Sequence, residues 1–169
     1  MNSQIKVNLI DNTKEVIIKG NITEFICSSN NLTYLNLDKN KNLFFLHCTD
    51  CGLTTLNLEK NTNLQTLNCS SNPLSTLNLS INLRNLECSK TNLINILNID
   101  KNVNLNNIYC PNNQFSLNTI IKILRFIGKT KIKSGYCNLK NNKYTDFTQP
   151  SELIEALNAA KANKWYIDY

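Results

Sequence analysis

The feature that most constrains the fold is a cysteine that recurs at intervals of about 21 residues, each time at the end of a short apolar pattern. These cysteines are Cys27, Cys48, Cys69, Cys88 and Cys110. A second apolar pattern recurs between them, as Leu35-Asn36-Leu37, Leu56-Asn57-Leu58, Leu77-Asn78-Leu79 and Leu97-Asn98-Ile99. A fixed period of this length indicates a solenoid, in which each turn buries its apolar side against the next turn. Because such a core has no cleft, we expect function on the long outer surfaces.

Each turn is expected to have two extended sides joined by bends that contain asparagine. The first half of a turn reads Leu-x-x-Leu-x-Cys-x-x-Asn-x-Leu, and its clearest copy is Leu64, Leu67, Cys69, Asn72 and Leu74. The step from Leu67 to Cys69 predicts a strand with one buried face. The asparagine three places after the cysteine is expected to bond backbone groups of its own turn and of the adjacent turn. The second half repeats this pattern in a weaker form, with little room for a helix.

The repeat resembles a leucine-rich repeat of the short, nested 21-residue bacterial kind, and it covers roughly residues 20–116. The closing segment Asn163-Lys164-Trp165-Tyr166-Ile167 is similar to the terminal Lys-Gly-Trp-x-Val segment of such proteins. The resemblance is to leucine-rich repeat proteins of Bacteroidetes-like bacteria. A phage of such bacteria is an alternative source of the chain. The resemblance implies a right-handed leucine-rich repeat solenoid of about five turns, mainly β, with an α/β cap at the C-terminal end.

One continuous domain in three parts is expected. These are an N-terminal β-hairpin cap over residues 1–20, the leucine-rich repeats over 21–116 and the α/β C-terminal cap over 117–169. Two strand-like runs on either side of Asp11-Asn12-Thr13 predict the hairpin. In the C-terminal cap, Ser116 is a good N-cap for a helix that Gly128 would stop. Residues 133–139 read as a strand, a second helix is expected from near Pro150 to Ala162, and Trp165 is expected to seal the last turn.

The chain starts without a basic and apolar signal region, and no apolar run approaches the roughly 20 residues that a membrane span needs. We therefore expect a cytoplasmic protein, or a virion protein if a phage encodes it. Thiols stay reduced in the cytosol. The repeated cysteines are accordingly interpreted as small buried hydrophobic residues and not as disulfide partners.

Cys48-Thr49-Asp50-Cys51 is the one motif that could indicate metal or redox chemistry. A zinc site needs two more ligands, and the only histidine, His47, is expected on the opposite face of its strand. The repeat explains both thiols, because Cys48 occupies the recurring cysteine position and Cys51 the recurring asparagine position. We predict no metal site, no cofactor and no catalytic residues, since most acid–base schemes lack a partner here.

The outward positions of the first half of each turn offer a candidate binding surface. The residues expected to contact a protein partner there, on the concave sheet, are Phe45, His47, Asn68, Glu87 and Tyr109. Exposed aromatic groups supply binding energy at protein interfaces, although isolated exposed apolar residues are also ordinary. The function predicted from this surface is a non-catalytic protein–protein interaction module, and the identity of its partner stays open.

The formal charge of +6 is concentrated toward the C-terminal end, where residues 101–143 contain eight basic residues and no acid. The basic patch expected on the cap consists of Lys122, Arg125, Lys129, Lys131 and Lys133. Such a patch attracts acidic proteins, anionic lipid or nucleic acid, or it is simply solvated. The alternative function is therefore a structural or assembly component, for instance of a phage virion, that docks through this cap. Nonspecific nucleic-acid binding comes third, because the repeats lack basic residues interleaved with aromatic ones.

Overall fold

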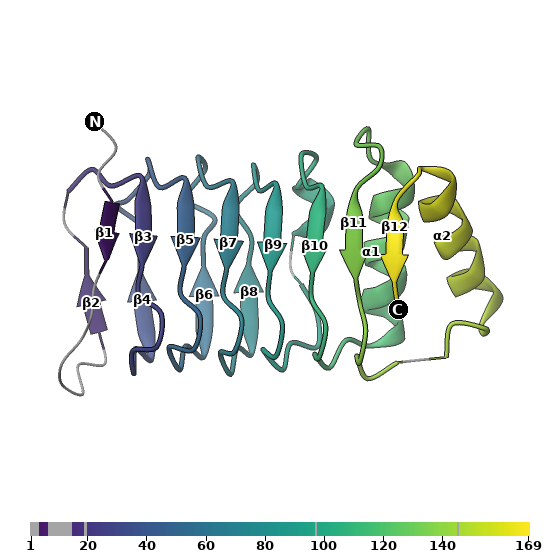
Figure 1. Cartoon of the computed structure of the whole chain (residues 1–169), viewed down its shortest axis with the longest axis horizontal. Helices are drawn as coiled ribbons and strands as arrows, with labels where there is room; N and C mark the ends of the chain where they lie inside the picture. Colours follow the sequence, from purple (N-terminus) through teal and green to yellow (C-terminus); the bar gives the residue numbers. More distant parts are fainter. Residues whose placement is uncertain (1–3, 7–14, 19, 97, 145) are drawn as a thin grey trace.

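The computed structural model describes residues 4–6, 15–18, 20–96, 98–144 and 146–169. They form a mainly-β solenoid of about 4 turns, followed by a C-terminal region with two helices. Figure 1 shows the coils arranged along the long axis of the molecule, with both helices at the C-terminal end. The mainly-β solenoid with a C-terminal cap that the sequence predicts is confirmed.

One side of the solenoid, called the first side, is a parallel eight-stranded sheet. In spatial order its strands are β1 (Gln4–Lys6), β3 (Glu24–Ile26), β5 (Phe45–His47), β7 (Thr66–Asn68), β9 (Asn85–Glu87), β10 (Asn107–Tyr109), β11 (Tyr136–Asn138) and β12 (Tyr166–Asp168). The strands pair in register, so that Leu46 lies beside Leu67 and Leu67 beside Leu86. Each of these middle residues is buried, and the residues before and after it point outward. The sheet therefore presents two parallel rows of outward side chains.

The opposite side, called the second side, is interrupted. There β2 (Glu15–Ile17) pairs with β4 (Tyr34–Asn36), and β6 (Thr55–Asn57) pairs with β8 (Thr76–Asn78), in two separate sheets. At the fourth copy of the leucine–asparagine pattern, where a strand was expected, Ile99 begins a 3-10 helix, η1 (Ile99–Lys101). Asn98, the residue before η1, has a left-handed conformation (φ 61°), which a β-strand does not accommodate.

The N-terminal strands correct the expectation of a β-hairpin cap over residues 1–20. A hairpin requires β1 and β2 to pair with each other, whereas β1 pairs in parallel with β3 and β2 pairs in parallel with β4. These two strands continue the two sides of the solenoid, so the hairpin prediction is wrong. An alternating apolar pattern fits both arrangements, and parallel pairing extends the ladder that the coils already form. The turn predicted at Asp11-Asn12-Thr13 lies outside the described residues.

Two helices close the C-terminal end, α1 (Leu117–Lys129) and α2 (Ser151–Ala162). The Ser116 hydroxyl caps α1 by accepting a hydrogen bond from the Thr119 N–H (3.3 Å), as predicted. Gly128 does not stop α1, which runs one residue beyond it. Its role is packing against α2, because a Cβ at this position would lie 2.9 Å from the Ala159 Cβ. Neither described helix combines the length and the apolar character needed to cross a membrane.

The predicted strand over residues 133–139 is present as β11, and the last strand, β12, pairs beside it. Trp165 is buried between these elements and seals the end of the core, as expected. A Cβ on Gly135 would come within 2.5 Å of the Trp165 ring, so only glycine allows this contact. The indole Nε1 donates to the Ile132 carbonyl (3.0 Å), which satisfies the one polar group of the ring.

Candidate binding surfaces

A column of buried amide side chains holds the coils in register behind the sheet. The Asn72 Nδ2 donates to the Cys48 carbonyl of the preceding coil (2.7 Å) and to the Cys69 carbonyl of its own coil (2.9 Å). Its Oδ1 accepts from the backbone N–H groups of Cys51 (3.1 Å) and Leu53 (3.0 Å). One side chain thereby satisfies four buried backbone groups in two coils, which is the role the sequence predicts for it.

The outward surface of the eight-stranded sheet, called the sheet face, consists of the first and third residues of its strands. The row of first residues contains Glu24, Phe45, Thr66, Asn85, Asn107, Tyr136 and Tyr166. The row of third residues contains Ile26, His47, Asn68, Glu87, Tyr109, Asn138 and Asp168. All five residues predicted to bind a partner lie on this face, on the four neighbouring strands from β5 to β10.

The predicted residues form two kinds of local contact. The Phe45 and His47 rings lie edge to face, with centroids 6.3 Å apart, and both are half-buried. Asn68 and Glu87 are joined by a hydrogen bond of 2.6 Å from the Asn68 Nδ2 to the Glu87 Oε2. Tyr109 lies one strand beyond Glu87 and is 40% exposed. The centre of the face is therefore polar and pre-ordered, while aromatic groups lie toward both ends.

The sheet face contains two tyrosines that the sequence argument missed. Tyr136 and Tyr166 stack with ring centroids 5.8 Å apart and an interplanar angle of 12°. Tyr166 is 67% exposed, the most exposed of the large hydrophobic residues among those described. Together with Tyr109 on the neighbouring strand β10, these residues form what we call the tyrosine cluster. Their signal in the sequence was weak, because the helical segments before β11 and β12 break the 21-residue period.

The tyrosine cluster borders one exposed ion pair. The Lys140 Nζ lies 2.7 Å from the Asp168 Oδ1, and this hydrogen bond raises the pKa of Lys140. Asn138 lies beside Tyr109 in the row of third residues, and its Nδ2 donates to the Tyr136 hydroxyl (3.1 Å). The cluster thus combines flat apolar rings with hydrogen-bonding groups at their edges, a composition typical of protein interfaces.

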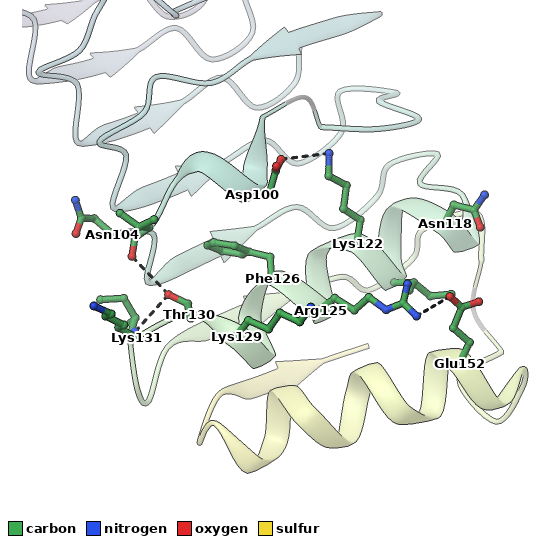
Figure 2. Close-up of a pocket in the computed structure, with 13 residues that line it drawn as sticks. Asp100, Asn104, Asn118, Lys122, Arg125, Phe126, Lys129, Thr130, Lys131 and Glu152 are labelled. Carbon is green, nitrogen blue, oxygen red and sulfur yellow. Dashed lines mark hydrogen bonds and ion pairs between the residues drawn. The ribbon is translucent and has the colours of Figure 1, made fainter.

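The predicted basic patch lies on the second side, around a groove between η1 and α1. Lys122, Arg125, Lys129 and Lys131 line this groove, which has a volume of about 770 Å³. Figure 2 shows the first three of these side chains extending from α1. Lys133 is not among the lining residues, and its Nζ donates to the Asn163 Oδ1. The structure therefore brings four of the five predicted residues together.

The C-x-x-C motif is divided between two structural positions. Cys48 and Cys51 are buried, and the Cys51 thiol donates to the Cys27 carbonyl (2.8 Å) in the column that Asn72 continues. His47 points outward on the sheet face, away from the Cys48 side chain. Within the described ranges, no group of three or more histidine, cysteine, aspartate or glutamate side chains is placed to hold a metal ion.

Comparisons with known proteins add no family to this description. No protein-family model matches the chain, and a search of curated proteins also found no match. The fold and the two surfaces therefore carry the functional argument.

Proposed function

We propose that the protein is a non-catalytic interaction module that binds a protein partner through the sheet face. The observation that carries this proposal is the tyrosine cluster, in which exposed rings lie on a continuous rigid sheet. Side chains on a sheet lose little conformational freedom on binding, and tyrosine gives a large contact area with a polar edge. The polar centre around Asn68 and Glu87 would set orientation, and Phe45 and His47 would extend the contact toward the N-terminal coils.

The proposed binding surface extends along most of the sheet. Neighbouring strands lie about 4.8 Å apart, so the distance from β5 to β12 across five strand spacings is about 24 Å. A standard interface buries about 800 Å² on each partner, so the loops that flank these three-residue strands would contribute to the contact as well. A resemblance to leucine-rich repeats, which bind proteins through such sheets, is consistent with the proposal.

The experiment compares two double variants as baits against a lysate of the source organism. The first, Tyr109→Ala with Tyr166→Ala, truncates the tyrosine cluster, and the second, Tyr34→Ala with Ile94→Ala, truncates exposed side chains off this sheet. Captured proteins are quantified by mass spectrometry at low and high salt. We expect at least one protein to be retained by the wild type and the control at both salt concentrations, and to be lost from the cluster variant. Equal capture by both variants would refute the use of this face.

A further inference from the structure

The groove between η1 and α1 has a chemistry of its own, distinct from that of the sheet face. Its apolar lining includes Val103, Ile121, Phe126 and Ile132. Val103 is 62% exposed, and Phe126 and Ile132 are partly buried against the core. Val103, Phe126 and Ile132 therefore form an exposed apolar surface, and exposed apolar surfaces of this kind mark interaction sites.

The cations around the groove are of two kinds. Lys122 and Arg125 already hold carboxylates, Asp100 at 3.4 Å and Glu152 at 2.7 Å. All four of these side chains are about half exposed, so the ion pairs are weak and exchangeable. By contrast, Lys129 and Lys131 are exposed and form no ion pair with any described carboxylate. Figure 2 shows Lys129 on α1 and Lys131 in the segment that follows this helix.

We propose that this groove binds an acidic peptide segment of a partner protein, in which a large apolar side chain is flanked by aspartate or glutamate. The apolar side chain would cover Val103, Phe126 and Ile132, where burial of apolar area provides the affinity. The flanking carboxylates would pair with Lys129 and Lys131, because charge-assisted hydrogen bonds to carboxylates fix register as well as adding energy. The volume of about 770 Å³ lies in the range of sites that enclose a ligand of this size.

The same groove is poorly suited to nucleic acid. The negative charges of Asp100 and Glu152 already neutralise Lys122 and Arg125, which leaves Lys129 and Lys131 as the cations without an ion pair among the described lining residues. The Asp100 carboxyl keeps this charge well into the acid range, because its own backbone N–H and then Lys122 lower its pKa. Phe126, the only aromatic residue of the lining, is partly buried and offers no free ring for base stacking. An acidic peptide needs no free ring for stacking, and its flanking carboxylates can pair with Lys129 and Lys131.

The test uses the full chain and a fluorescein-labelled peptide that alternates glutamate with leucine and phenylalanine, titrated by fluorescence anisotropy. Two matched peptides replace glutamate by glutamine, or the apolar residues by serine. We expect saturable binding of the first peptide, at least about tenfold tighter than binding of either matched peptide. Binding that does not saturate would overturn the proposal. Equal affinity for the serine peptide would also overturn it, because charge attraction alone would then explain the binding. Competition by a single-stranded oligonucleotide better than by unlabelled peptide would also overturn it.

Variants locate the site. Lys129→Glu with Lys131→Glu should weaken peptide binding about tenfold or more, while Lys41→Glu with Lys143→Glu, the same charge change away from the groove, should alter it less than about twofold. Val103→Ser, at an exposed position, should weaken binding severalfold without a change of charge. Circular dichroism checks that each variant is folded. An equal loss of peptide affinity in both double lysine variants would refute the assignment of the binding site to this groove. The Tyr109→Ala and Tyr166→Ala variant should bind the peptide normally, so the two surfaces can fail independently.

Discussion

Both sides of the solenoid contain buried asparagine side chains, but their hydrogen bonding differs. On the first side, Asn72 and Asn113 each engage both ends of the amide, with Nδ2 donating to two coils and Oδ1 accepting backbone N–H groups. On the second side, Asn61 donates to the Leu37 carbonyl (2.8 Å) and the Asn40 carbonyl (3.0 Å). Its Oδ1 is buried without a partner, as is the Oδ1 of Asn40.

This difference parallels the continuity of the two sheets. The first side keeps eight strands in one sheet, whereas the second side has two separate strand pairs and η1. An amide that bonds through both ends fixes the separation and register of adjacent coils, while one that only donates leaves the neighbouring N–H groups to other partners. We infer that the doubly bonded column makes the first side a rigid platform, which is where the proposed partner surface lies.

The two sides also differ in the residue that closes each strand, and the strongest test concerns this difference. The first side uses cysteine where the second side uses Leu37, Leu58, Leu79 and Ile99. Five thiols are fully buried and have raised pKa values, mainly because of burial: Cys48, Cys69, Cys88, Cys110 and Cys137. Such groups stabilise the fold fully below the unfolded pKa, near 9.0, and lose that contribution as the pH rises beyond it.

Alkaline pH should therefore destabilise the protein strongly. Between pH 8 and pH 10 the free energy of unfolding should fall by up to about 7 kcal/mol for five such thiols, at about 1.4 kcal/mol per thiol and pH unit above the unfolded pKa. Urea denaturation under reducing conditions measures this. In a Cys69→Ala variant, the free energy of unfolding should fall less steeply with pH, by the contribution of one thiol, about 1.4 kcal/mol per pH unit. An unfolding free energy that stays constant from pH 8 to pH 10 would contradict the buried, protonated column.

The next largest effect is expected from Asn72→Ala. This change leaves the Cys48 and Cys69 carbonyls and the Cys51 and Leu53 N–H groups without their amide partner in a buried site. We expect a loss of about 4 kcal/mol, because several buried polar groups become unsatisfied at once. Chemical denaturation gives the value, and a loss below about 1 kcal/mol would show that the column does not hold the first side together.

The matched change on the second side, Asn61→Ala, should cost less, about 2 kcal/mol. Two donated hydrogen bonds are lost, but the variant also removes the Asn61 Oδ1, which is buried without a partner. Measured under the same conditions, the ratio of the two losses tests the comparison directly. A loss equal to that of Asn72→Ala would mean that both amide columns contribute alike.

The sequence predicted the repeated elements well, because the 21-residue period reports directly which residues stack. Cys69, Leu67 and Asn72 all occupy the positions that the pattern assigns to them. The hairpin over residues 1–20 was wrong, since an alternating pattern does not distinguish antiparallel pairing from one more parallel coil. At the fourth coil, the sequence around Asn98 and η1 resembles the copies that form strands, so the 3-10 helix was not predicted.

The candidate surfaces were only partly predictable, for the same physical reason. Phe45 to Tyr109 lie within the period, so their shared face could be derived from the sequence. Tyr136 and Tyr166 join that face only because α1 and α2 fold back and return the chain to the sheet. The groove requires Val103 and Phe126 to line the same cavity, and this depends on how α1 packs against η1. Long-range packing of this kind has no signature in residue spacing.

The smallest effect is the most specific test of the asparagine column. Cys51 occupies a column position with a thiol that donates to the Cys27 carbonyl, and its sulfur is a weaker acceptor than the Asn72 Oδ1. By the repeat offset, an asparagine there would donate to the same carbonyl and replace the sulfur by a stronger oxygen acceptor. Cys51→Asn should therefore raise the free energy of unfolding by about 1 kcal/mol, while Cys51→Ala should lower it by a similar amount. Differential scanning calorimetry resolves both shifts. If the asparagine variant is destabilised instead, Cys51 does not occupy an asparagine position of the repeat. The C-x-x-C motif would then again be a candidate for metal or redox chemistry.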